Sequence, residues 1–275
     1  MRTAEDGLIH YGNPPVIEVV CGILFKPIRL LLAPHLGLLW EKFRSEYPKC
    51  REVPPLAPII EEFEDRGGVP ELRVQLTEKP PLPRIWFIHR NENGIIQVQR
   101  DRFLHNWRRV RPDDEYPRYY RVIEMFRKHL SSFESFLEEN GLGRITPLQY
   151  EMTYVNHIPK GEGWETINEI GTVFPDFAFR RQPERFLPLP EAINWRTSFV
   201  LPERVGRLHV TIRRTVEKES SHPILLLELT VRGIGSEKSF DEMWSWFDLA
   251  HEWIVYGFAD LTGKEVQRTV WKRKD

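Results

Sequence analysis

Hydrophobic and polar positions in the first half of the chain follow two periods, one typical of strands and one of helices. β-Branched residues are dense at 15–25, which predicts a strand buried on at least one face. Apolar residues then recur every three or four positions at 36–43, which predicts a short helix. Residues 51–83 are rich in proline and acidic side chains, so we expect a long exposed excursion there, with one strand at 72–76.

The clearest local pattern is a hairpin followed by a long helix. Two apolar runs at 84–89 and 95–100 flank Asn93-Gly94, and this dipeptide supplies the positive φ angles that a tight turn needs. One apolar stripe with helical spacing then covers 117–140, which predicts a helix of about six turns that ends at Asn140-Gly141.

The second half repeats this order of elements. A strand at 146–158 precedes a short helical segment at 164–170, a proline-rich excursion at 174–190 and, at the end, a long helix at 240–261. Three further strands are predicted between the excursion and the last helix: 195–201, 207–214 and 224–231.

This repetition predicts the architecture. We expect an α+β fold made of two pseudo-repeated halves that together form an antiparallel sheet, with the long helices packed on it. The predicted halves are 1–142 and 143–275, joined in one compact unit.

Composition narrows the class of protein without naming a reaction. The 275 residues are 41% hydrophobic and 29% charged, as in globular proteins, which excludes collagenous and disordered classes. With 39 basic and 40 acidic side chains, the chain lacks the charge of a dedicated DNA or membrane-surface binder. Two cysteines, Cys21 and Cys50, are too few for a disulfide framework. Since we also find no signal peptide and no apolar stretch of about 20 residues, we expect a cytoplasmic protein.

The last predicted helix has a wider apolar arc than packing on one sheet face requires. Besides its main stripe, it carries a second stripe of aromatic and apolar residues: Trp246, Leu249, Trp253 and Tyr256. Either the other half of the chain or a second subunit covers this stripe, because large exposed aromatic patches are uncommon on monomers. We expect a homodimer with these four residues at the interface.

A basic and aromatic segment, 100–111, follows the predicted hairpin. Guanidinium groups bind phosphate and aromatic faces stack on bases, so the segment is a candidate site for a nucleotide or single-stranded nucleic acid. Its candidate ligand-binding residues are Arg100, Arg102, Asn106, Trp107, Arg108 and Arg109. Alternatively, the segment is solvated or paired with acids, because Asp113, Asp114 and Glu115 follow directly, and its aromatic residues are core anchors.

Candidate catalytic residues are few. The sequence has no glycine-rich phosphate loop, no nucleophile elbow and no histidine pair at metal-ligand spacing, so we expect neither metal nor cofactor. Glu18 and Glu151 occupy matching positions in the two halves and, with His157, are the catalytic candidates. Glu151 and His157 lie about 20 Å apart along one strand, too far for a direct acid–base couple. In the alternative interpretation, each glutamate pairs with an arginine or caps a sheet end.

Four separated segments of the chain carry a resemblance to known proteins: 13–18, 97–108, 151–157 and 250–271. In order along the chain, they resemble a sporadically distributed family of uncharacterised prokaryotic proteins. The resemblance implies no particular reaction or cofactor. The patchy distribution implies horizontally transferred accessory genes, for example in defence islands or toxin–antitoxin loci.

Two functional hypotheses follow. The first is a non-enzymatic, cytoplasmic accessory factor that binds another protein, because no catalytic motif is present and aromatic surface is in surplus. The second is a nucleotide or single-stranded nucleic-acid binder that uses the 100–111 segment. Its binding would weaken with salt and on loss of Arg108.

Overall fold

A computed structural model describes residues 7–63, 82–177, 186–188, 190–217, 220–234 and 240–274. The strand predicted at 72–76 and part of the second proline-rich excursion lie outside these described residues. Within the described ranges, no helix has the length and apolar character needed to cross a membrane.

The elements alternate between strands and helices in both halves of the chain. The helices are α1 (Ala33–Phe43), α2 (Tyr119–Glu139), α3 (Ile170–Val173), α4 (Phe240–Leu261) and α5 (Lys264–Thr269), with short 3-10 turns at Ile167–Glu169, Pro175–Phe177 and Pro202–Arg204. The strands are β1 (His10–Tyr11), β2 (Val16–Phe25), β3 (Lys49–Val53), β4 (Arg84–Ile88), β5 (Gly94–Gln99), β6 (Arg102–Arg108), β7 (Pro147–Pro159), β8 (Asn194–Val200), β9 (Arg207–Val216), β10 (Pro223–Ile234) and β11 (Arg273–Lys274).

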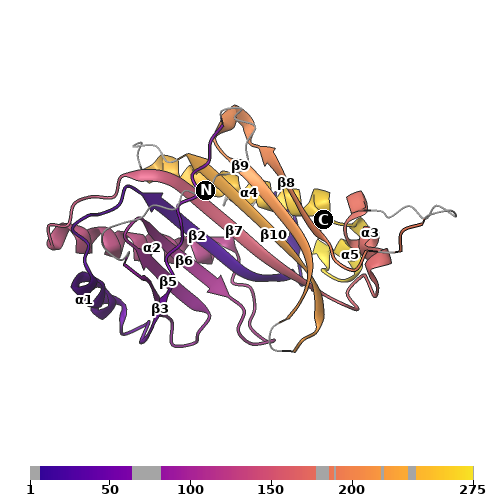
Figure 1. Cartoon of the computed structure of the whole chain (residues 1–275), viewed down its shortest axis with the longest axis horizontal. Coiled ribbons are helices and arrows are strands. Elements are labelled where there is room, and N and C mark those ends of the chain that lie inside the picture. Colours follow the sequence, from indigo (N-terminus) through magenta and orange to yellow (C-terminus); the bar gives the residue numbers. More distant parts are fainter. Residues whose placement is uncertain are drawn as a thin grey trace.

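One antiparallel sheet of the described residues extends through both halves, in the order β3-β4-β5-β6-β2-β7-β10-β9-β8. Apart from the edge strand β3, this order is the same from both ends. In it, β2 matches β7, β6 matches β10, β5 matches β9 and β4 matches β8. A pseudo-two-fold axis therefore passes between β2 and β7, which pair in the middle of the sheet. Helices α2 and α4 are the matching helices and lie behind the sheet in Figure 1. The predicted α+β fold of two pseudo-repeated halves is confirmed.

The local predictions differ from the structure at β6 and at the short strands β1, β3 and β11, which were not predicted. The hairpin of β4 and β5 and the long helix α2 lie where the pattern placed them. Residues 102–108, predicted only as a basic and aromatic segment, form β6, which pairs with both β5 and β2. The short helical segment predicted at 164–170 instead ends at Val173, as a 3-10 turn followed by α3.

The core lies between the sheet and its two long helices. Alternate side chains of β2, such as Cys21 and Phe25, are fully buried on this side. Phe103 of β6 stacks on Phe133 of α2 with ring centroids 4.9 Å apart. Gly22 is needed on the opposite face, because a Cβ there would lie 2.1 Å from the Leu104 side chain. The periodic apolar stripes thus locate the core correctly.

The two ends of the described chain meet in a small second sheet. β1 pairs with β11, so that His10 lies opposite Lys274 and Tyr11 opposite Arg273. The buried side chain of Gln267 joins the two ends further, because it accepts a hydrogen bond from the Tyr11 hydroxyl at 3.1 Å. The N-terminal segment is thereby held against α4 and α5.

Candidate functional site

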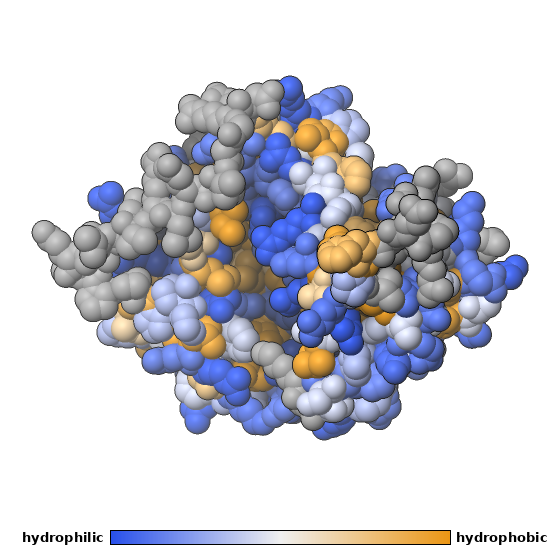
Figure 2. Space-filling view, turned by 45° about the vertical axis from the view of Figure 1, so that its right-hand side comes forward, coloured by the Kyte–Doolittle hydropathy of each residue, from blue (hydrophilic) through white to orange (hydrophobic). Residues whose placement is uncertain are grey.

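The two long helices cover one face of the large sheet, and we call the opposite face the open face. Side chains alternate between the two faces along each strand. The open face carries mostly polar and charged residues, among them Glu18, Arg84, Gln97, Asn106, Arg108, Glu151, His157, Arg196, Arg207, His209, Thr211, Arg213, Glu228 and Arg232. Figure 2 shows this side of the molecule obliquely, with hydrophilic residues gathered along a hollow.

Two glutamine side chains hold the 54–63 segment across one end of the open face. The Gln99 carboxamide accepts a hydrogen bond from the Leu56 amide at 2.9 Å and donates to the Leu56 carbonyl at 3.0 Å. Gln149 likewise accepts from the Glu61 amide at 2.7 Å and donates to the carbonyl two residues earlier at 2.8 Å. Each side chain therefore replaces the hydrogen bonds of a neighbouring strand.

A directional chain of hydrogen bonds crosses the first half of the open face. Arg84 and Trp86 can only donate, and both donate to Gln97 Oε1, at 2.8 and 2.9 Å. The amide nitrogen of Gln97 must then face Asn106 Oδ1, 2.7 Å away. Asn106 in turn donates to Glu18 Oε1 at 2.6 Å. The donors at one end thus fix the orientation of both amides and leave the carboxylate of Glu18 as the final acceptor.

The two glutamates singled out from the sequence have equivalent surroundings. Glu18 of β2 lies opposite Arg108 of β6, and Glu151 of β7 lies opposite Arg232 of β10. Arg232 Nε donates to Glu151 at 2.6 Å. Burial raises the pKa of Glu18, which the hydrogen bond from Asn106 and the charge of Arg108 oppose. Glu151 thus pairs with an arginine, as the alternative interpretation proposed, whereas Glu18 bonds to Asn106 and lies opposite Arg108, whose Nε donates to the Glu92 carbonyl.

A buried carboxylate from the crossing segment joins the second half of the open face. Glu61 accepts hydrogen bonds from Arg207 and from His209, the latter at 2.7 Å. Burial alone would raise the pKa of Glu61, but the hydrogen bond and charge of His209 and the charge of Arg207 outweigh it and lower the pKa. The segment is therefore fixed at Leu56 by the Gln99 amide and at Glu61 by both the Gln149 amide and the charged side chains.

The candidate ligand-binding residues of the 100–111 segment do not share one surface. Asn106 and Arg108 lie on the open face, and so does Arg102, whose side chain is buried and paired with Asp101 at 3.4 Å. Trp107 points to the helix side, where it packs on Tyr116 with ring centroids 5.4 Å apart. It offers no free ring face for a base.

The two remaining arginines of that segment lie outside the strand. The Arg100 side chain donates to the Leu31 carbonyl at 3.3 Å, and the Arg109 backbone amide donates to the Ile17 carbonyl at 2.7 Å. Alternation along β6 therefore divides a segment that is continuous in sequence.

The catalytic candidates share the open face without forming one site. Glu18 bonds to Asn106, Glu151 bonds to Arg232, and among the described residues neither carboxylate hydrogen-bonds to His157. Burial lowers the pKa of His157. The described residues also contain no group of three histidine, cysteine or acidic side chains that could hold a metal ion.

The second stripe of α4 is partly covered within the chain. Trp246 is buried, packs on Tyr150 and donates to the Val205 carbonyl at 3.0 Å. Leu249 and Trp253 are half-buried against the core. Tyr256 is 40% exposed. Of the four residues predicted at a homodimer interface, Trp246 is therefore buried within the chain, and Tyr256 is the most exposed.

Several open-face residues were missed by the sequence analysis. Arg196 of β8 and Arg213 of β9 are exposed, and neither forms an ion pair with another described residue. Glu228 of β10 lies beside them, opposite Thr211. Their signal is weak in sequence because each strand contributes only one or two charges, at alternate positions.

Fold and site together define the class: an α+β protein with helices on one side of its sheet and a charged, hollowed sheet face on the other. The chain matches no protein-family model, no curated protein and no solved structure. The resemblance to a family of prokaryotic proteins therefore stays a prediction, and function is argued from the geometry of this chain.

Proposed function

We propose that this chain is a non-enzymatic binding protein and that its open face binds a segment of another protein. The observation that carries the proposal is the hollowed open face, most of whose charged side chains are half-buried and which the two long helices leave uncovered. Antiparallel sheets often leave one face to water. A face that contacts only water does not require buried, hydrogen-bonded amide side chains such as those of Gln97 and Asn106.

The open face is ordered before any partner arrives. Glu18, Asn106 and Gln97 are fixed by the hydrogen-bond chain, while Glu61 and Glu151 are held by arginines. A surface whose side chains are already ordered loses less conformational entropy when it binds. Such preorganisation supports recognition of a particular partner.

The chemistry of the partner follows from the charges that remain. Arg196 and Arg213 are exposed and adjacent on β8 and β9, where Arg196 lies opposite Thr211 and Arg213 lies opposite Asn194. These arginines offer bidentate donors to carboxylates. We therefore expect the partner segment to present acidic side chains to this corner of the open face.

A polypeptide fits this surface better than a nucleic acid does. Glu18, Glu151 and Glu228 stand among the arginines, so a nucleic acid, which carries a charge on every phosphate, would meet these carboxylates as it crosses the face. A polypeptide can instead place single acidic side chains at the corner of Arg196 and Arg213. Trp107, the residue expected to stack on a base, lies in the core. Protein interfaces combine direct hydrogen bonds with a polar rim, and the arginines and amides of this face can supply both.

The test is site-specific photocrosslinking in the native host. A photoreactive amino acid replaces Thr211, which is half-buried on the open face, and a matched variant carries it at the exposed Glu124 of α2. The expected result is a defined protein adduct from position 211 that position 124 does not give. Adducts that nuclease removes would overturn the proposal in favour of nucleic-acid binding, and identical adducts from both positions would also refute it.

Affinity measurements with the purified adduct partner complete the test. Charge reversal by Arg213→Glu is expected to weaken binding at least tenfold, whereas Arg121→Glu, on an exposed turn of α2, leaves it unchanged. An equal effect of both substitutions would contradict binding at the open face. A partner encoded beside this gene would fit the accessory role that the resemblance implies.

Assembly and location remain part of the proposal. Both cysteines are free, Cys21 in the core and Cys50 at the surface, as suits the reducing cytoplasm. A homodimer through Trp253 and Tyr256 would cover the outer part of α4, on the side of the molecule away from the open face. Native mass spectrometry at micromolar concentration is expected to show the dimer, and a monomer would refute it.

A further inference from the structure

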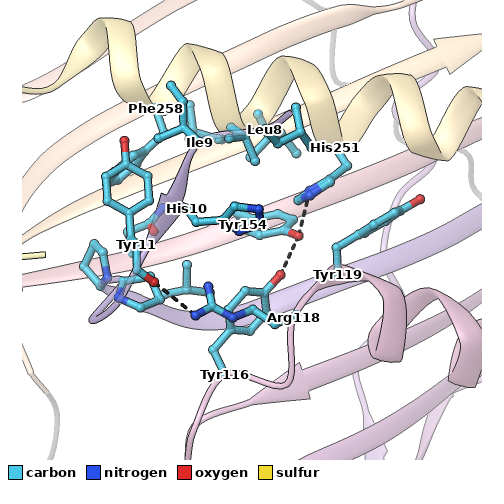
Figure 3. Close-up of a pocket in the computed structure, with 17 residues that line it drawn as sticks. Leu8, Ile9, His10, Tyr11, Tyr116, Arg118, Tyr119, Tyr154, His251 and Phe258 are labelled. Carbon is cyan, nitrogen blue, oxygen red and sulfur yellow. Dashed lines mark hydrogen bonds between the residues drawn. The ribbon is translucent and has the colours of Figure 1, made fainter. Parts of the chain in front are cut away.

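A pocket opens on the helix side of the sheet, away from the open face. It has a volume of about 70 Å³, is partly open to solvent and exceeds several-fold the space that one water molecule needs. The N-terminal segment around β1, the loop before α2, strand β7 and helix α4 form its walls (Figure 3). No residue of this pocket was a candidate in the sequence analysis, because its walls come from both ends of the chain.

One wall of the pocket is apolar. Leu8 and Ile9 of the N-terminal segment lie beside Phe258 of α4 (Figure 3), and Ile254 of the same helix also lines the pocket. Tyr11 packs its ring edge-on against Phe258, with centroids 5.3 Å apart. Such a wall favours a hydrocarbon or aromatic group over a hydrated one.

The opposite wall is a chain of neutral hydrogen-bonding groups. The hydroxyls of Tyr116 and Tyr154 lie 2.7 Å apart, and Tyr154 bonds to Nδ1 of His251 at 3.1 Å. The His251 ring stacks on Tyr119 at a centroid distance of 4.1 Å. Burial, together with a smaller effect of the charge of His10, lowers the pKa of His251 to about 3, so the imidazole is neutral at physiological pH.

The fixed charge of the pocket comes from Arg118. Figure 3 shows its guanidinium between the backbone of Tyr11 and the ring of Tyr116. Among the described residues, the guanidinium donates one hydrogen bond, to the Tyr11 carbonyl at 3.1 Å, although it carries five N–H groups. The remaining donors can serve a planar anion in the pocket.

The backbone of Arg118 is strained. Its φ of 70° and ψ of 160° lie in a region that glycine alone adopts readily. A residue with a side chain in this conformation lowers the stability of the folded protein. A binding role for its guanidinium would explain why arginine stands where glycine fits better.

We propose that this pocket binds a small monocarboxylic acid with a short apolar or aromatic body. The carboxylate pairs with the Arg118 guanidinium, and the body lies against the wall formed by Ile9, Ile254 and Phe258. This site is independent of the open face, so either proposal can fail without the other.

The test uses Arg118→Gly, which removes the guanidinium and also relieves the strained backbone. Binding of benzoate and of the smaller isovalerate is measured by calorimetry and by chemical-shift changes in NMR spectra. The expected result is at least tenfold weaker binding by Arg118→Gly, together with an equal or higher melting temperature. Because the variant is expected to fold at least as well, loss of binding reports on the guanidinium.

Two controls make the outcome decisive. Arg121→Ala removes an exposed arginine one turn along α2 and is expected to bind both acids as the wild type does. Benzamide, a neutral analogue of benzoate, is expected to bind at least tenfold more weakly than benzoate. The proposal is overturned if the wild type binds neither acid at millimolar concentration, if Arg118→Gly binds them equally well, or if benzamide binds as tightly as benzoate.

Discussion

Replacing His129 by phenylalanine should stabilise the protein, and more strongly in mild acid. His129 of α2 is 1% exposed, and neither of its ring nitrogens has a hydrogen-bond partner among the described residues. Its ring edge meets Phe43 and Tyr47 at centroid distances of 5.6 and 5.1 Å. A buried polar group without a partner costs about 1–3 kcal/mol, so His129→Phe is expected to raise the free energy of unfolding by about that amount at pH 7.

The pH dependence gives a second and sharper magnitude. Burial, together with smaller effects of the charges of Lys128 and His89, lowers the pKa of His129 to about 3. The folded state therefore stays neutral while the unfolded chain takes up a proton below about pH 6.5, so stability falls as the pH drops from there. From pH 7 to pH 5 this linkage costs the wild type about 2 kcal/mol, a loss that the phenylalanine variant avoids.

Urea denaturation at pH 7 and pH 5 measures both effects. The stability difference between His129→Phe and wild type should grow from about 1–3 kcal/mol at pH 7 to about 3–5 kcal/mol at pH 5. His222→Gln, at an exposed histidine, serves as the control. Its stability relative to wild type should be the same at pH 7 and at pH 5. A difference that is the same at both pH values, or a variant less stable than wild type at pH 7, would refute this reasoning.

Four further substitutions test separate parts of the fold. Gly233→Ala places a Cβ 2.1 Å from Trp246 Nε1 and should lower the free energy of unfolding by about 1–3 kcal/mol in urea denaturation. Gly37→Ala, in open space on α1, should raise it by about 0.5–1 kcal/mol. Equal effects would contradict the close packing of Gly233 against Trp246. Glu61→Gln should destabilise by about 1–3 kcal/mol at pH 7. Because the folded-state pKa of Glu61 is lowered, the stability it contributes is present above about pH 4.5 and is lost in acid, so thermal melts should converge there; a constant difference would exclude the charge. Gln149→Leu should release the 54–63 segment, so that limited proteolysis cuts it faster than in wild type, and an unchanged cleavage rate would show that the segment is held otherwise.

Much of the fold follows from patterns that local physics enforces. The Asn93-Gly94 turn and the apolar stripe of α2 depend on neighbouring residues, and both lie where they were predicted. The repeated order of elements gave the pseudo-symmetric sheet. Strand β6 was not predicted because residues 100–111 were interpreted from their basic and aromatic composition. Their period of two, in which Phe103, His105 and Trp107 face one side, indicates the strand.

The sites were harder to predict because they depend on which strands become neighbours. Glu18 and Glu151 were singled out by their matching positions. The sheet register places an arginine opposite each of them, and Glu151 forms an ion pair with the one opposite it, Arg232. The hydrogen-bond chain from Arg84 to Glu18 needs the order β4-β5-β6-β2, which no local pattern specifies. The pocket around Arg118 depends on contact between the two chain ends, which only the complete fold brings together.

The pairing of β1 with β11 gives the molecule a mechanical weak point. The strands are antiparallel, and His10 lies beside Lys274, so a force that pulls the two ends of the chain apart loads their hydrogen bonds one after another. Next in line are the bonds from Gly12 to Lys272 and from Asn13 to Trp271, at 2.9 and 3.0 Å. The nine-stranded sheet bears load only after the hydrogen bonds between the two ends of the chain have broken. Tension on the chain would therefore remove Leu8 and Ile9 from the pocket while the sheet and its open face stay intact.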